Sequence, residues 1–259
     1  MQNYAGIKYH NTFLNQVIIR MDFLQFLETE KLFNDDTEKV ILKLFPRRGI
    51  DQKIHFNTIN VVIDPNKTNP PSTQKETLEG IQREYYSGRN KILLTNKFLV
   101  LEINEYDTFD QHYQWFQAIL IALYSKQRIT SARIGIRYIN LFDSERLKLR
   151  KNMFSPEISA ALSAKEKVSE IGLRLTRAMS LEEYQLGNMI LNFRYGMFNP
   201  DYPNPLTKDS FSLDYDCFTT EPIDSMDGIL RTITLGHDAI QELFEASITD
   251  SLRKVLFNE

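Results

Sequence analysis

The segment Ser131–Asp143, with the sequence S-A-R-I-G-I-R-Y-I-N-L-F-D, constrains the fold more than any other part of the chain. Ile134, Ile136 and Tyr138 alternate with Arg133 and Arg137, so that apolar and cationic side chains fall on opposite faces of an extended chain. This pattern predicts a β-strand with one face in a hydrophobic core and two arginines on the other face.

The same alternation recurs on both sides of this segment, and helix-like periodicity follows each group of strands. Asp64–Thr77 contains three prolines and no apolar residue, so we expect a surface loop there. Ser144–Lys167 is charged and compatible with a helix that begins near Pro156. We predict further strands over residues 13–23, 54–63, 78–86, 91–94, 98–106, 171–175, 189–195 and 211–217, and helices over 36–44, 109–123 and 225–248.

The order of these elements predicts an α+β fold. Its antiparallel sheet would be built from two similar halves, each consisting of several strands followed by one long amphipathic helix. Residues 1–127 form the first half and residues 128–259 the second, within one compact unit. The last helix carries Gly236 in its interior, which should weaken or bend it. The pattern leaves open whether the sheet is open or closes toward a barrel.

Charge and cysteine content exclude several classes of protein. The formal net charge of the 259 residues is −3, so no global positive field attracts nucleic acid or anionic lipid. The single cysteine, Cys217, excludes an internal disulfide bond. No secretion signal precedes the first predicted strand, and no apolar run is long enough to cross a membrane. We therefore expect a cytoplasmic protein with no membrane partner.

The polar faces of the predicted strands carry an unusual number of arginines and aspartates. They could form a surface that binds a protein partner or an anionic ligand, because guanidinium groups donate paired hydrogen bonds to carboxylate and phosphate. They could equally form a solvated face held by cross-strand ion pairs. Arg20 and Asp22 are further candidates. The predicted binding residues are Arg133, Arg137, Asn140, Arg174, Arg194, Asp214 and Asp216.

A catalytic interpretation has less support. Asp214 and Asp216 have the spacing to hold a divalent cation, which would suit a metal-dependent nucleic-acid-processing enzyme. Such an enzyme usually needs a third acid and a nearby lysine or histidine, and the sequence offers neither in a recognisable motif. His237 lies on the apolar stripe of the last helix and Cys217 alternates with core residues, so both are expected to be structural. We assign no catalytic residue, no metal ligand and no cofactor.

The motif R-x-G-x-R-Y-x-N, formed by Arg133, Gly135, Arg137, Tyr138 and Asn140, resembles the central hallmark of a sporadically distributed bacterial family of unknown function. Asp214-x-Asp216 and Leu235-Gly-His237 resemble later parts of the same pattern. The resemblance implies no activity, because none is established for the family. The patchy distribution of the family implies an accessory role in antiviral defence or toxin control, with a protein partner encoded nearby.

From these observations we expect a non-catalytic binding protein that uses its arginine- and aspartate-rich sheet face. A protein partner is the first expectation for what binds there, and an anionic small ligand or nucleic acid is the second. The alternative is the metal-dependent enzyme that uses Asp214 and Asp216.

Overall fold

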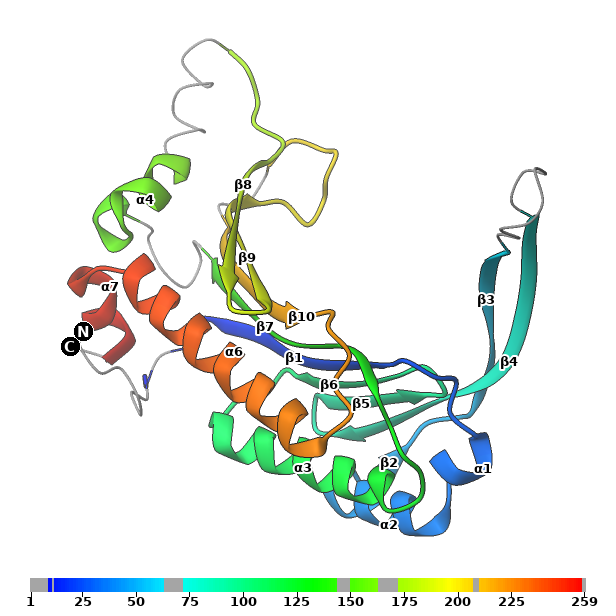
Figure 1. Cartoon of the computed structure of the whole chain (residues 1–259). Helices are drawn as coiled ribbons and strands as arrows, with labels where there is room; N and C mark the ends of the chain where they lie inside the picture. The colour runs from blue at the N-terminus through cyan, green and yellow to red at the C-terminus, as the bar shows by residue number, and fades with distance from the viewer. Residues whose placement is uncertain are drawn as a thin grey trace.

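The computed structural model describes residues 9–10, 12–62, 72–143, 150–162, 172–206 and 210–257. Its centre is an antiparallel sheet whose strands follow the order β2-β4-β5-β6-β1-β7-β10-β9-β8, with β3 paired to β4 (Figure 1). The strands are β1 (Leu14–Phe23), β2 (Arg47–Arg48), β3 (Gln52–Val62), β4 (Ser72–Ser87), β5 (Asn90–Thr95), β6 (Phe98–Ile103), β7 (Ser131–Asp143), β8 (Ala178–Leu186), β9 (Met189–Phe198) and β10 (Ser210–Thr219).

The two longest described helices, α3 and α6, lie side by side against one face of this sheet (Figure 1). The helix α6 contacts β7, β9 and β10, and α3 contacts α2. The α+β class and the antiparallel sheet expected from the sequence are therefore confirmed. The described helices are α1 (Thr29–Leu32), α2 (Asp35–Leu44), α3 (Phe109–Tyr124), α4 (Pro156–Leu162), α6 (Met226–Ser247) and α7 (Asp250–Phe257).

Strand β7 has the bounds that its alternating pattern predicts. Ile134, Ile136 and Tyr138 are buried against the helices, whereas Arg133 and Arg137 are half-buried on the opposite face. Apolar side chains at every second residue remove one face from water, which is the dominant favourable term in assembling such a sheet.

Each long helix begins where a side chain caps its first turn. The hydroxyl of Thr108 accepts a hydrogen bond from the backbone N–H of Gln111, as the sequence predicts for α3. For α6 the cap is Ser225, one residue after the expected Asp224, and its hydroxyl accepts from the N–H of Gly228. Both caps satisfy N–H groups that have no partner within their own helix.

Gly236 does not interrupt α6, which is helical throughout Met226–Ser247. A Cβ atom at this position would lie 2.9 Å from Cγ2 of Ile136 and 3.3 Å from Cε of Met189. The glycine therefore lets the helix approach the sheet closely, and this packing offsets its low helix propensity.

The structure corrects several predicted boundaries. No strand covers residues 172–175; the strand of this region is β8, which begins at Ala178. The predicted loop Asp64–Thr77 is wrong at its end, because residues 72–77 belong to β4. Residues 64–71 lie outside the described part of the chain. Strands β3 and β4 extend together as a hairpin that projects from the rest of the sheet (Figure 1).

Two further helices, α4 and α7, lie in the second half of the chain. The expected helix within Ser144–Lys167 is α4, and residues 144–149 and 163–167 of that segment are not among those described. Helix α7 follows α6 and has no counterpart among the predicted helices. Among the described helices, none combines the length and the apolar content needed to cross a bilayer.

Gly135 of β7 provides a test of this packing. A Cβ atom there would lie 2.6 Å from Cβ of Phe218 and 2.9 Å from the carbonyl oxygen of Cys217. We expect Gly135→Ala to lower the free energy of unfolding by about 1–3 kcal/mol in urea titrations, because the neighbouring strand must move. The matched control is Gly49→Ala, where the nearest atom is 3.4 Å away and little loss is expected. Equal stability of the two variants would contradict the close packing of β7 against β10.

Candidate functional site

The sheet has one face that no described helix covers, and we call it the open face. The pairing of neighbouring strands determines which residues lie on this face. Lys91 pairs with Glu102, Glu102 with Ile18, Ile18 with Arg137, and Arg137 with Asp216. Residues directly opposite each other point to the same side of a sheet. The open face includes Ile18, Arg20, Asp22, Lys91, Leu93, Phe98, Val100, Glu102, Arg133, Gly135, Arg137, Asn192, Arg194, Asp214, Asp216 and Phe218.

A paired hydrogen bond between Arg137 and Asp214 lies near the middle of the open face. Nε and Nη2 of Arg137 donate to the two carboxylate oxygens of Asp214, at 2.7 and 2.6 Å. Asp214 is 8% exposed, and Nη1 of Arg194 lies 3.6 Å from one of its oxygens. The carboxylate is thus desolvated and held between two guanidinium groups, the geometry in which charge-assisted hydrogen bonds are strongest.

Arg133 and Asp216 form the neighbouring pair. Nη2 of Arg133 lies 3.5 Å from Oδ1 of Asp216, and its guanidinium carbon lies 4.4 Å from the ring centre of Phe218. Burial raises the pKa of Asp216, and the nearby arginines act in the opposite direction. This half of the face therefore combines a cation, an aromatic ring and a partly desolvated carboxylate.

Arg20, Lys91, Arg133, Arg137 and Arg194 each have a carboxylate within 4 Å. Arg20 donates to Asp22 at 2.8–3.2 Å and also lies over the ring of Phe98, while Lys91 lies 3.2 Å from Glu102. Arg20, Asp22, Phe98 and Glu102 line a hollow of about 470 Å³, and Gly135 lines it as well. Gly135 contributes only backbone atoms to this hollow, and Phe218 of β10 packs closely against it.

The structure brings together five of the seven predicted binding residues. Arg133, Arg137, Arg194, Asp214 and Asp216 all lie on the open face.

The other two predicted residues lie elsewhere. Asn140 belongs to the opposite, helix-covered face. Side chains alternate along a strand, so Asn140 points to the same side as Tyr138, two residues before it, and away from Arg137. Arg174 lies before β8, outside any strand, and is exposed.

The geometry does not favour a metal at Asp214 and Asp216. Both oxygens of Asp214 already accept from Arg137, so a cation would have to displace a guanidinium group. Within the described ranges, no three His, Cys, Asp or Glu side chains gather as a metal site would require. Cys217 is buried, and burial raises the pKa of its thiol to about 12, which agrees with a structural rather than a nucleophilic role.

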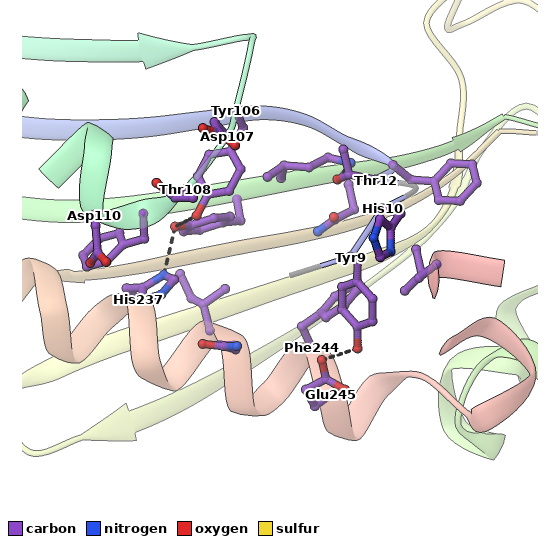
Figure 2. Close-up of a pocket in the computed structure, with 18 of the residues that line it drawn as sticks. Tyr9, His10, Thr12, Tyr106, Asp107, Thr108, Asp110, His237, Phe244 and Glu245 are labelled. Atoms are coloured by element: carbon purple, nitrogen blue, oxygen red, sulfur yellow. Dashed lines mark hydrogen bonds between the residues drawn. The ribbon is translucent and has the colours of Figure 1, made fainter. Parts of the chain in front are cut away.

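A second concave site lies on the helix-covered face, and we call it the aromatic pocket. It encloses about 560 Å³ between α6, the segment that leads into α3, and the residues before β1. Figure 2 shows His237, Phe244 and Glu245 on α6, with Tyr106–Thr108 above them and Tyr9, His10 and Thr12 at the other end. Its lining residues include Tyr106, Phe109, Asp110, Tyr138, Asn140, His237, Phe244 and Glu245.

Three polar side chains of the aromatic pocket form a chain of contacts. The hydroxyl of Tyr138 lies 2.9 Å from Nδ1 of His237 and 3.4 Å from the hydroxyl of Tyr106 (Figure 2). The imidazole stacks on Phe109, with ring centres 3.8 Å apart and planes 5° apart. Burial lowers the pKa of His237 to about 4, so the ring is neutral near pH 7, and burial raises the pKa of Tyr138 and of Tyr106.

The sequence alone does not identify the aromatic pocket. It predicts a hydrogen-bonded, structural His237, and the contact with Tyr138 agrees with that expectation. The pocket depends on residues from β7, α6 and the connection into α3, which no local pattern brings together. The sequence gives one indication of this pocket: Asn140 is a polar residue at a position where the alternation of β7 places apolar side chains.

Comparisons with protein-family models, with curated proteins and with solved structures find no match to this chain. The resemblance to the sporadically distributed bacterial family therefore remains a prediction based on the residues of its motif.

The Arg137–Asp214 pair can be tested by a double-mutant cycle. Arg137→Met should lower the free energy of unfolding by about 1–3 kcal/mol, because it leaves a buried carboxylate with one distant cation. Arg194→Met should cost less, since the paired hydrogen bonds remain. Arg137→Met with Asp214→Leu should recover part of the loss, because the uncompensated charge is removed. Urea titrations measure all three, and an equal cost for Arg137→Met and Arg194→Met would contradict the assigned geometry.

Proposed function

We propose that this protein is a non-catalytic binding protein whose open face receives a protein partner. The observation that carries the proposal is the set of apolar side chains on a sheet face without a described helix over it. Ile18, Leu93, Phe98, Val100 and Phe218 all belong to this face. Val100 is buried and the other four are half-buried, with Arg20 over the ring of Phe98 and Arg133 over that of Phe218. A solvated sheet face normally alternates to polar residues, so apolar side chains among charged ones on this face favour an interaction site.

The composition of the open face favours a protein over a small anion. Its arginines and lysine are already paired with carboxylates, so an anionic ligand would have to displace one of them. A protein surface with both signs of charge can instead complement the pairs without breaking them. Arginine and aromatic side chains are also the types enriched where interfaces are most tightly packed.

The hollow at Gly135 suggests the chemistry of the partner. Arg20, Phe98, Arg133 and Arg137 surround it, and its volume of about 470 Å³ can accept one or more large side chains. We expect the partner to present a protruding apolar or aromatic side chain, flanked by at least one acidic and one basic residue. Such a central anchor inside a polar rim is how binding energy is usually distributed in an interface.

The strand order supports the further proposal that the two halves of the chain are duplicated units. From the centre outward, β1 is followed by β6, β5 and β4, and β7 is followed by β10, β9 and β8. Each series precedes one long helix, α3 in the first half and α6 in the second. The open face then spans the junction of the two units, because β1 and β7 lie next to each other in the sheet.

An accessory role in antiviral defence or toxin control follows only from the resemblance of the motif, and it stays a prediction. The proposed partner would then be the product of a neighbouring gene. The metal-dependent enzyme has no observation in its favour beyond the spacing of Asp214 and Asp216.

The experiment compares two arginine-to-glutamate variants in the cells that naturally contain the protein. Arg20 lies on the open face with a half-exposed side chain, whereas Arg231 is exposed on α6 on the other side of the sheet. Arg20→Glu should reduce co-purification of the partner at least about tenfold, because one reversed charge at an interface costs roughly 1.4 kcal/mol or more. Arg231→Glu should leave it unchanged.

Three controls make the result decisive. Quantitative mass spectrometry of the co-purified proteins must find the same partner with the wild type and with Arg231→Glu, and a photo-crosslinker placed at Leu93 must join to that partner. Melting temperatures of both variants must stay close to that of the wild type. A partner that survives Arg20→Glu, or a dimer of this chain that Arg20→Glu disrupts, would overturn the proposal.

A further inference from the structure

The aromatic pocket has the dimensions of a small-molecule site. Its volume of about 560 Å³ lies within the range of roughly 300–1,000 Å³ that such sites occupy. It is on the helix-covered face, and no side chain of the open face lines it. Any ligand of this pocket is therefore distinct from the partner proposed for the open face.

Asn140 is the residue that most directly indicates a ligand. It is 8% exposed and lines the pocket, and its side chain makes no hydrogen bond to any residue that the structure describes. A side-chain amide can donate two hydrogen bonds and accept two, and the amide of Asn140 lines the pocket, where solvent or a ligand can pair with it. An amide kept in this state is expected where a ligand supplies the missing partners.

The walls of the pocket favour a planar ligand. Phe109, Tyr138, His237 and Phe244 surround it with rings, and Tyr106 adds a further ring whose centre lies 5.8 Å from that of Tyr138. Flat aromatic surfaces bind flat aromatic molecules, because bases stack favourably on such rings. The ring nitrogen Nε2 of His237 has no hydrogen-bond partner among the described residues, so it offers a second polar contact.

The charges near the pocket oppose an anion. Asp107, Asp110 and Glu245 line it, and the nearby cation Arg253 is bound to Glu245 at 3.0 Å and to Asp250 at 2.8 Å. His237 is neutral near pH 7, so it does not balance these carboxylates. A phosphate group in the pocket would be repelled by carboxylates and would find no free cation among the described lining residues.

We propose that the aromatic pocket binds a planar nitrogen heteroaromatic molecule of the nucleobase or nucleoside class that carries no phosphate. Asn140 pairs with an adjacent donor and acceptor on the edge of the ring, the geometry in which an asparagine amide binds adenine through two hydrogen bonds. The aromatic side chains hold the plane of the ring. The carboxylates at the pocket exclude the phosphorylated form of the same molecule.

The test is a titration of the purified full chain with adenosine, guanosine, cytidine and uridine, and with their 5′-monophosphates, followed by saturation-transfer NMR and calorimetry. At least one nucleoside should bind, and its monophosphate should bind at least tenfold more weakly. Failure of all four nucleosides to bind would overturn the proposal. So would a monophosphate that binds as tightly as its nucleoside.

Two asparagine variants separate a binding role from a structural one. Asn140→Leu should weaken nucleoside binding at least tenfold and should melt at or above the temperature of the wild type, because it removes no side-chain hydrogen bond within the described part of the protein. The matched control is Asn192→Leu on the open face, where the side-chain oxygen is buried without a partner among the described residues. It should leave nucleoside binding unchanged. A lower melting temperature for Asn140→Leu, or equal loss of binding in both variants, would show that Asn140 is structural and would overturn the assignment.

Discussion

The pairing of β1 with β7 is the interaction on which the rest of this structure depends. The two strands are more than a hundred residues apart in the chain, and their register joins Val17 to Tyr138, Ile19 to Ile136 and Met21 to Ile134. All six of these side chains are buried. Each strand then carries its own half of the sheet, so the hydrophobic core becomes continuous only when this central pair forms.

The same pairing creates two chemically different surfaces. On β7, Arg133, Gly135 and Arg137 contribute to the open face, whereas Tyr138 and Asn140 line the aromatic pocket. Because side chains alternate strictly along a strand, a slip of one residue would exchange these sets and bury the arginines beneath α6. The register of β1 on β7 therefore determines both the position of the ion pairs and the position of the unpaired amide.

Alternation at residues 131–143 is enough to predict β7, and with it the common orientation of Arg133 and Arg137. Helix α3 and helix α6 are predictable because their apolar stripes and capping residues are local in sequence. The alternation predicts that Arg137, Arg194 and Asp214 lie on one face of the sheet. It does not predict that both arginines contact Asp214, because those contacts depend on the register between strands.

The features that the sequence did not predict have equally specific physical reasons. Strand β8 is exposed along much of its length and carries Glu182 and Glu183 in its centre, so it lacks the apolar alternation of a core strand. The motif does not show that Asn140 lies on the opposite face from Arg133 and Arg137, because side chains alternate along β7; its predicted role in binding stays a prediction. The aromatic pocket is not foreseeable because Phe109 and His237 stack only when two helices far apart in sequence lie together.

Hydrogen exchange of the backbone amides tests the central role of the β1–β7 pair most directly. If the two halves depend on this pairing, the amides of Ile19, Met21, Ile136 and Tyr138 should exchange only through global unfolding, with one common free energy that also applies to the cores of β6 and β10. If β7, β9, β10 and α6 instead open together at a clearly lower free energy than β1, β5, β6 and α3, the halves are independently stable units. That result would contradict a fold whose core depends on the central strand pair.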